Sequence, residues 1–380
     1  ILYMKIGIVC YPTFGGSGVV ATELGMALGI KGHEVHFITY NQPVRLNFLS
    51  KNVHFHEVFV EEYPLFQYQP YELALSSKMV SIVERYNLDI LHVHYAIPHA
   101  YAAYMAKQIL KTKGIDIKVV TTLHGTDITL VGSHPIYKQA VEFSINNSDY
   151  VTTVSESLKQ DTLRLFDIKK DIKVIHNFIE MDKYPEHTEE ECQRATLADV
   201  NERIIVHVSN FRPVKRIEDV ILIFDKILKK IPAKLLLVGE GPEREKVDNL
   251  VKKLNLKDKV HFLGNSQDVN KILCYADLFL LPSETESFGL SALEAMAAKT
   301  PVISTNSGGL PEVNVEGVTG YLSNVGDVDE MANNALKILL DETTLNTFKQ
   351  NAFTHARTFE LEIVLPKYEA IYRHVKKGCC

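Results

Sequence analysis

Short apolar runs alternate with amphipathic stretches along this chain. An uninterrupted apolar run is typical of a buried strand in a parallel sheet. Apolar residues spaced three and four apart indicate a helix that packs one face on such a sheet. Strands that alternate with helices therefore predict a doubly wound parallel sheet. In the first part of the chain the predicted strands are 5–10, 35–39, 89–94, 118–123 and 150–154, and the predicted helices are 19–31, 77–86, 101–111 and 137–146.

A second series of the same kind follows a break in the pattern. Residues 180–201 are charged and weakly periodic, and we interpret them as a linker. The predicted strands beyond it are 203–208, 234–238, 260–263, 277–281 and 301–304, and the predicted helices are 220–230, 243–254, 269–276, 291–298 and 364–376. The sequence thus predicts an α/β protein with two doubly wound, Rossmann-like domains, residues 1–178 and 179–363.

Composition narrows the class of protein. The 380 residues include 46% hydrophobic ones, enough for two full cores, and the net charge of −6 lacks the basic field of a nucleic-acid binder. No apolar run has the length of a membrane helix, so we expect no stable membrane insertion. The five cysteines show neither zinc spacing nor a disulfide framework, which favours a reduced, cytoplasmic protein.

Residues 282–294 carry the clearest chemical signal. They lie between a predicted strand and a helix that begins near Gly289, where unpaired backbone N–H groups favour a phosphate. Glu286 and Glu294 flank that point, and carboxylates accept hydrogen bonds from sugar hydroxyls. Together they suit a nucleotide sugar, although acids at a helix N-terminus are also common without a ligand.

This stretch also resembles a known signature. Two Glu residues eight positions apart, with Ser287, Phe288, Gly289 and Leu290 between them, are similar to the motif of the retaining family 4 glycosyltransferases of the GT-B class. The resemblance implies that Glu286 meets the donor sugar and Glu294 the ribose. It implies two domains that face each other across a cleft, with a C-terminal helix, 364–380, returning to the first domain. It also implies a donor site that includes Gly16, Asn210, Gly264, Ser287, Phe288, Gly289 and Leu290.

A glycine-rich loop, residues 15–18, follows the first predicted strand. It lacks the spacing of a dinucleotide-binding fingerprint. Gly16 and Ser17 suit an anion-binding helix N-terminus, and a tight turn that needs glycine is an equally open interpretation.

Another candidate segment, residues 124–127, follows a predicted strand and so lies at a ligand-binding edge. The resemblance assigns His124 to the donor sugar, and we expect Asp127 to orient it. His92, His94 and His99 lack a carboxylate or cysteine at metal-ligand spacing, so we interpret them as packing residues and expect no metal site.

A basic loop follows the first strand of the second domain. Arg212 and Lys215 are placed there to clamp a diphosphate. The family pattern has an arginine where Asn210 stands, so Arg212 would have to take its place. Glycine turns at Gly239 and Gly264 resemble loops that bind the base.

Three further segments, residues 11–25, 92–100 and 121–129, narrow the resemblance. They imply retaining transfer of N-acetylglucosamine from UDP-N-acetylglucosamine to the hydroxyl of L-malate, the first step of bacillithiol biosynthesis, without a metal or other cofactor. Ser17, Tyr95 and Thr126 are the predicted acceptor residues, with Arg45 a looser candidate. The alternatives are a UDP-sugar epimerase, a family 4 enzyme with another small-molecule or lipid acceptor, and a non-catalytic nucleotide-sugar binding protein. The oligomeric state stays open, a homo-oligomer included.

Overall fold

The structure is a computed structural model that describes residues 3–378 apart from residues 14, 48–49, 63, 65–66, 185–193 and 267. The chain divides into two compact units, Ile1–Asn177 with Leu361–Cys380, and Phe178–Glu360. The middle of the predicted linker, the last two residues of the predicted C-terminal helix and Cys192, Cys379 and Cys380 lie outside the described residues. No helix in the described part of the chain combines the length and the apolar character that crossing a membrane requires.

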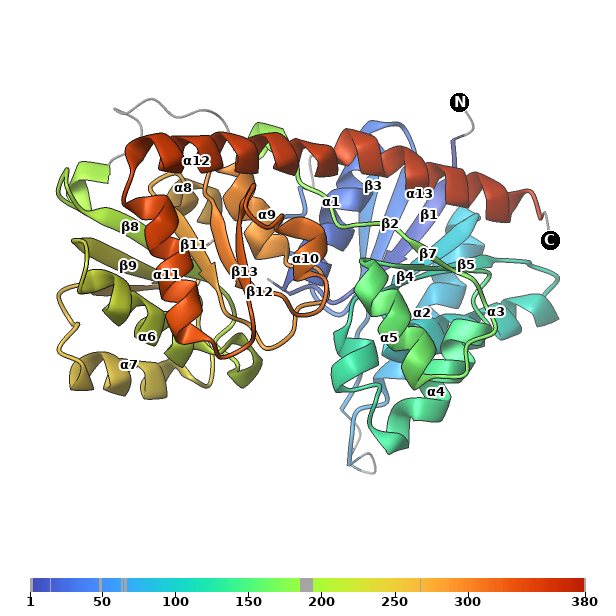
Figure 1. Ribbon diagram of the computed structural model, residues 1–380. Coiled ribbons are helices and arrows are strands. Elements are labelled where there is room, and N and C mark those ends of the chain that lie inside the picture. The colour runs from blue at the N-terminus through green and yellow to red at the C-terminus, as the bar shows by residue number, and fades with distance from the viewer. Residues whose placement is uncertain are drawn as a thin grey trace. The chain divides into compact units, whose positions relative to one another are not determined.

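The first unit is built on a seven-stranded parallel sheet (Figure 1). Its order is β3-β2-β1-β4-β5-β6-β7, so the direction of winding reverses between β1 and β4. The strands are β1 Lys5–Val9, β2 Glu34–Thr39, β3 Val53–Glu57, β4 Ile90–His94, β5 Lys118–Leu123, β6 Tyr150–Thr153 and β7 Ile172–Val174. The helices are α1 Gly16–Ile30, α2 Tyr71–Tyr86, α3 Tyr101–Thr112, α4 Pro135–Asn146, α5 Glu156–Leu165 and α13 Leu361–Lys376.

Alternation along the strands explains how helices cover both faces of this sheet. Successive side chains of β1 point to opposite faces. Val9 joins a buried cluster with residues of α2 and α3, including Met79 and Ala103. Ile8 points the other way, toward α1, where a Cβ on Gly25 would lie 2.8 Å from the Ile8 side chain. The glycine therefore lets α1 approach the sheet closely.

The last helix, α13, packs on the first unit through polar contacts. The Tyr372 hydroxyl and His92 Nδ1 are 2.7 Å apart, and both side chains are fully buried. Glu369 Oε1 lies 3.1 Å from His33 Nε2, and Lys376 forms an ion pair with Asp89 at 2.8 Å. His92 therefore serves packing, as the sequence predicted.

The second unit repeats the architecture with six parallel strands in the order β10-β9-β8-β11-β12-β13. Its winding reverses between β8 and β11. The strands are β8 Arg203–Val208, β9 Ala233–Val238, β10 Val260–Gly264, β11 Leu278–Leu281, β12 Val302–Thr305 and β13 Gly320–Ser323. The helices are α6 Ile217–Leu228, α7 Arg244–Lys253, α8 Val269–Leu273, α9 Leu290–Ala297, α10 Leu310–Val313, α11 Val328–Leu339 and α12 Glu342–Ala356. The predicted α/β fold class, two doubly wound parallel sheets, is confirmed.

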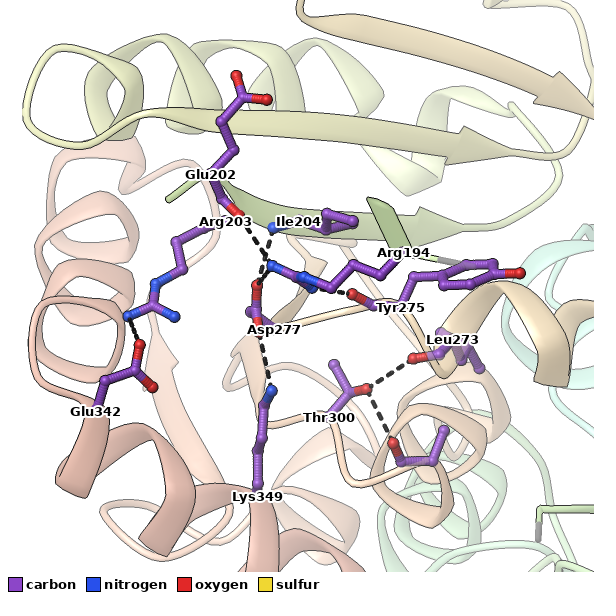
Figure 2. A network of polar contacts seen from close by, with 11 residues as sticks. Arg194, Glu202, Arg203, Ile204, Leu273, Tyr275, Asp277, Thr300, Glu342 and Lys349 are labelled. Atoms are coloured by element: carbon purple, nitrogen blue, oxygen red, sulfur yellow. Dashed lines mark hydrogen bonds and ion pairs between the residues drawn. The ribbon is translucent and has the colours of Figure 1, made fainter. Parts of the chain in front are cut away.

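A polar network fastens the amino ends of the strands in the second unit (Figure 2). Asp277, just before β11, accepts hydrogen bonds from Arg194 at 2.7 Å, Lys349 at 2.9 Å and the backbone N–H of Ile204 at 3.0 Å. Burial alone would raise the pKa of Asp277, but Lys349 and Arg194 hold that pKa below its usual value. This network ties together the amino ends of β8 and β11. Doubly wound sheets bind their ligands at the opposite, carboxyl edge.

Candidate active site

The loops after β8 and β11 meet at the point where the strand order of the second unit reverses. Lys215 ends a short 3₁₀ turn after β8, and its Nζ lies 2.5 Å from Oε1 of Glu286 in the loop after β11. The Ser283 hydroxyl donates a second hydrogen bond to the same oxygen, at 2.9 Å. Both charged side chains are largely buried, with 19% and 13% of their surface exposed. Two predicted catalytic residues are thus neighbours, and Ser283 is a partner that the sequence did not reveal.

Backbone hydrogen bonds fix the two loops that carry this pair. The Glu284 N–H bonds the Val214 carbonyl at 2.8 Å, and the Gly309 N–H bonds the Glu286 carbonyl at 2.8 Å. Gly308 has a φ of +61°, and a Cβ there would lie 2.1 Å from the Glu286 carbonyl oxygen. Only glycine allows that approach, so the loop after β12 determines where Glu286 lies.

The other loops at this carboxyl edge are also joined. The Gly239 N–H bonds the Gly264 carbonyl at 2.8 Å, and the Phe211 N–H bonds the Glu240 carbonyl at 2.9 Å. The loops after β8, β9 and β10 therefore form one connected rim. Asn210 and Arg212 are exposed on it, and within the described residues the Arg212 side chain makes no ion pair. The Arg212 carbonyl accepts a hydrogen bond from the Lys215 N–H at 2.9 Å. The structure thus brings the Lys215 side chain to Glu286, but in the described part of the chain the Arg212 side chain bonds neither of them.

Helix α9 begins directly after the Glu286 loop. Its N-cap is Gly289, with a φ of +99°, so its first backbone N–H groups have no partner within the helix. Phe288 is 2% exposed and packs edge-on against Phe359, which anchors the loop. Ser287 and Leu290 are half-buried at the same helix end, and Glu294 is half-buried one turn further on. This end of α9 has the geometry of an anion site.

In the first unit a hydrogen bond joins the start of α1, which follows β1, to the loop after β4, again where the strand order reverses. The Ser17 and Tyr95 hydroxyl oxygens are 2.6 Å apart. Ser17 lies in the first turn of α1, whose backbone bends so closely that a Cβ on Gly18 would lie 2.5 Å from the Tyr11 carbonyl oxygen. Tyr95 adopts a φ of +90°, which is strained for a non-glycine residue and is typical of functional sites.

His124 lies beside this pair. Its ring centroid is 5.2 Å from that of Tyr95, and its Nε2 is 2.8 Å from His94 Nδ1. Asp127 contacts His124 through the backbone, because Asp127 Oδ1 accepts a hydrogen bond from the His124 N–H at 3.3 Å. It also accepts from the backbone N–H groups of Ala96 at 2.7 Å and Gly125 at 3.0 Å, so it joins the two loops. That Asp127 orients His124 stays a prediction. The hydrogen-bond partner of the ring is His94, although the sequence predicts only a packing role for His94.

Burial sets the protonation of these groups. It lowers the pKa of His124 to about 3 and that of His94 well below its usual value, so both imidazoles are neutral near pH 7. Burial raises the pKa of the Tyr95 phenol above its usual value, which keeps the hydroxyl protonated. It also raises the pKa of Asp127 to about 6, against the lowering effect of its backbone hydrogen bonds.

Two further acceptor candidates make no hydrogen bond to Ser17 or Tyr95 within the described residues. Thr126 begins a turn, Thr126–Leu130, and is half-buried, but within the described residues its hydroxyl makes no hydrogen bond to Ser17 or Tyr95. Arg45 forms an ion pair with the buried Glu23 at 2.7 Å. Its charge is therefore already compensated inside the first unit.

Comparison with known proteins identifies the family. Residues 14–183 match the family model described as Glycosyltransferase Family 4, and residues 188–355 match the model described as Glycosyl transferases group 1. The chain is 49% identical to the N-acetyl-alpha-D-glucosaminyl L-malate synthase of Bacillus anthracis, over 98% of this chain and 97% of that protein. This chain belongs to the family 4 glycosyltransferases.

Other relatives agree with that assignment. This glycosyltransferase is 31% identical to an uncharacterized glycosyltransferase of Methanocaldococcus jannaschii, over 92% of this chain and 94% of that protein. Among solved structures, the sucrose-phosphate synthase of Thermosynechococcus elongatus superposes with a TM-score of 0.82 at 21% identity, covering 99% of this chain and all of that one. Anabaena HepE in complex with UDP and glucose gives 0.83 at 19% identity, covering 98% and 100%. These structural matches confirm the predicted GT-B fold.

Proposed function

We propose that this glycosyltransferase moves N-acetylglucosamine from UDP-N-acetylglucosamine to the hydroxyl of L-malate, with retention at the anomeric carbon. The observation that carries the proposal is the 49% identity, along nearly the whole of both chains, to a protein named for that product. The chemistry of the predicted residues in both units supports it.

The second unit supplies groups suited to a sugar diphosphate. The N-terminus of α9 and Lys215 offer positive potential to the phosphates, and the exposed Arg212 adds a second cation at the same rim. In the proposed complex Glu294 accepts hydrogen bonds from the ribose hydroxyls. The proposal needs no metal, because these groups supply the positive charge that a leaving diphosphate requires.

The pairing of Lys215 with Glu286 gives each residue a role in the transfer. As the glycosidic bond breaks, negative charge grows on the β-phosphate, and Lys215 shares its hydrogen bonds between that oxygen and Glu286. Glu286, held by Ser283 as well, accepts from the donor sugar hydroxyls with its remaining lone pairs. The leaving phosphate takes the proton of the acceptor hydroxyl, so no separate carboxylate base is required.

His124 acts in this proposal as a neutral hydrogen-bonding group. A pKa of about 3 means that the ring is a neutral imidazole near pH 7, so it cannot act as an imidazolium general acid. If its Nδ1–H donates to a donor-sugar oxygen, its Nε2 must accept from His94 Nδ1–H, 2.8 Å away. His94 is then a positioning residue that fixes the tautomer of His124.

The first unit supplies donors for a dicarboxylate. Malate carries two negative charges, and a carboxylate that leaves water must be paired or hydrogen-bonded. The N-terminus of α1 and the joined hydroxyls of Ser17 and Tyr95 offer such donors at one place. Thr126 is a further candidate in the same unit, whereas Arg45 already forms an ion pair with Glu23.

An acceptor screen tests the proposal. The protein is incubated with UDP-N-acetylglucosamine and, in turn, L-malate, lactate and succinate, and products are identified by mass spectrometry. We expect an N-acetylglucosaminyl adduct with L-malate, little with the monocarboxylate lactate, and none with succinate, which lacks a hydroxyl. An adduct with a lipid acceptor but not with malate would move the chain to another acceptor class. Conversion of the donor without any acceptor would make it an epimerase, and binding without turnover a non-catalytic protein.

A further inference from the structure

Four polar side chains gather on β2 and β3 of the first sheet. In the strand order, β1 separates these strands from β4, which the Tyr95 loop follows. Glu34 and His36 lie two apart on β2, and His54 and His56 lie two apart on β3, so each pair points to one face of its strand. β3 is the edge strand and pairs in parallel with β2, with His36 opposite His54. We call these four residues the edge cluster.

Three atoms of the edge cluster come close enough to share one ion. The ligand atoms of Glu34, His36 and His54 all lie within 4.8 Å of one another. Glu34 Oε1 is 3.1 Å from His36 Nε2 and 3.8 Å from His54 Nε2. Ligands bound about 2.1 Å from a tetrahedral Zn²⁺ lie about 3.4 Å apart, so the two measured distances bracket the required spacing.

His56, the fourth member of the edge cluster, is a hydrogen-bond partner of His36. His56 Nε2 lies 2.8 Å from His36 Nδ1. Without a metal the His36 Nε2–H donates to Glu34 Oε1 at 3.1 Å, because a carboxylate only accepts. Metal binding displaces that proton, and in the other tautomer His36 Nδ1–H donates to His56 while Nε2 binds the ion. Metal-binding histidines characteristically have such an outer partner, which fixes the ring and its tautomer. The His36 side chain is fully buried, so its position is set by packing.

We propose that Glu34, His36 and His54 form a binding site for a divalent transition metal of the Zn²⁺ class. Two imidazoles and one carboxylate are donors that suit Zn²⁺ and leave a fourth position for water. The His54 ring stacks on His36 at 4.7 Å and must turn to aim its lone pair at the ion, which its 41% exposed side chain is free to do. The bound ion joins β2 to the edge strand β3. This inference does not depend on the proposed transferase reaction.

The charge of Lys5 opposes the binding of a cation at this site. Lys5 Nζ lies 3.0 Å from Glu34 Oε2, the carboxylate oxygen that the site does not use. A pocket lined by Lys5, Glu34 and His54 among others lies beside the cluster. The ammonium repels a cation and competes for the carboxylate, so removing it must tighten metal binding.

Isothermal titration with ZnCl₂ tests the site on the full chain, prepared without a polyhistidine tag. The wild type is compared with Glu34→Gln, His54→Gln and Lys5→Gln, and with His374→Gln as the control at an exposed histidine of α13. We expect one Zn²⁺ per chain, binding weakened about tenfold or more by Glu34→Gln and His54→Gln, unchanged by His374→Gln and strengthened by Lys5→Gln. Far-UV circular dichroism of each metal-free variant establishes that it is folded.

Two results overturn the proposal. One is Zn²⁺ affinity that His54→Gln leaves at the wild-type value in a folded protein. The other is a thiolate-to-metal charge-transfer band when Co²⁺ replaces Zn²⁺, which would place the ion on cysteine. A cobalt spectrum without that band, lost in His54→Gln, supports the imidazole and carboxylate site.

Discussion

Lys215 Nζ lies 2.5 Å from Glu286 Oε1, and the pair joins the loops after β8 and β11. The first unit has a similar relationship, because the Ser17 and Tyr95 hydroxyls, 2.6 Å apart, join the start of α1 after β1 to the loop after β4. In each unit these are the two strands between which the winding reverses. Doubly wound folds bind their ligands outside the carboxyl ends of those strands. Four predicted site residues therefore lie where this architecture places ligands.

Replacing Lys215 with Ala should lower turnover more than donor affinity. The lost cation faces charge that grows only as the sugar leaves, so we expect kcat to fall about 100-fold or more, the range seen when one such donor is removed. Steady-state kinetics with UDP-N-acetylglucosamine and malate measure it. Lys229→Ala, which removes an exposed lysine paired with Asp225, is the matched control. A normal kcat with only a raised donor KM would mean that Lys215 binds substrate and transition state equally.

Replacing Glu294 with Ala should weaken the binding of UDP. The ribose would lose up to two hydrogen bonds to a charged group, each worth about 1.5–3 kcal/mol. Calorimetry with UDP alone measures this without the chemical step, and Glu245→Ala on the exposed side of α7 serves as the control. If UDP binds the Glu294 variant as tightly as the wild type, Glu294 does not contact the ribose.

Replacing Tyr95 with Phe should raise the KM for malate and leave UDP affinity nearly unchanged. The change removes one hydroxyl and the hydrogen bond to Ser17, with little loss of volume. We expect the free energy of malate binding to weaken by about 0.5–3 kcal/mol, depending on whether the group that the Tyr95 hydroxyl contacts is charged. Ser17→Ala should act in the same direction, and Tyr101→Phe, at an exposed position of α3, should have no effect. The acceptor assignment of Tyr95 is lost if the malate KM stays the same, or if UDP affinity falls instead.

The buried histidines of the first unit should make it sensitive to acid. Burial lowers the pKa of His92 and His124 to about 3 and that of His99 to about 4, whereas the unfolded chain binds these protons near pH 6.5. The free energy of unfolding is therefore unaffected by these neutral rings above pH 6.5. It falls as pH drops toward 4, because only the unfolded chain binds their protons. Each contributes about 1.4 kcal/mol per pH unit to that loss.

One carboxyl group acts in the opposite direction. Burial raises the pKa of Asp127 to about 6, so the folded state gains stability as pH falls from 6 toward 4. Three or more histidines outweigh one carboxyl group, and the free energy of unfolding should fall between pH 6.5 and 4.5. Urea titrations at several pH values measure this, and His99→Gln should reduce the slope by one proton. Stability that stays constant over this range would show that these imidazoles are not held neutral.

The central strands of both sheets could be predicted from the sequence because they are buried on both faces. The apolar run of β11 is uninterrupted, and β5 combines three apolar residues with two β-branched threonines. The predicted bounds of both strands agree with the structure within a residue or so. The strands β3, β7 and β13 were not predicted. Each lies at an edge of its sheet, where exposure admits polar residues such as His54 and Lys173.

The sequence predicts candidate residues of the site, but it does not predict which of these residues contact one another. Glycines and charged side chains directly after predicted strands identify the loops that form the site. The sequence does not give the register of β4 against β5, which brings His94 near His124. Nor does it show that Asp127 has backbone N–H groups as its partners. Such pairings depend on loop backbone geometry rather than on strand or helix periodicity.

Proton NMR of one reaction mixture tests the central claim most directly. The protein is given UDP-N-acetylglucosamine with and without L-malate, and the anomeric signals and released UDP are followed together. With malate, we expect an α-linked N-acetylglucosaminyl malate that appears with an equal amount of UDP. Without malate, we expect no change in the donor. A β-linked product, or a donor altered at its sugar without malate and without release of UDP, would contradict it.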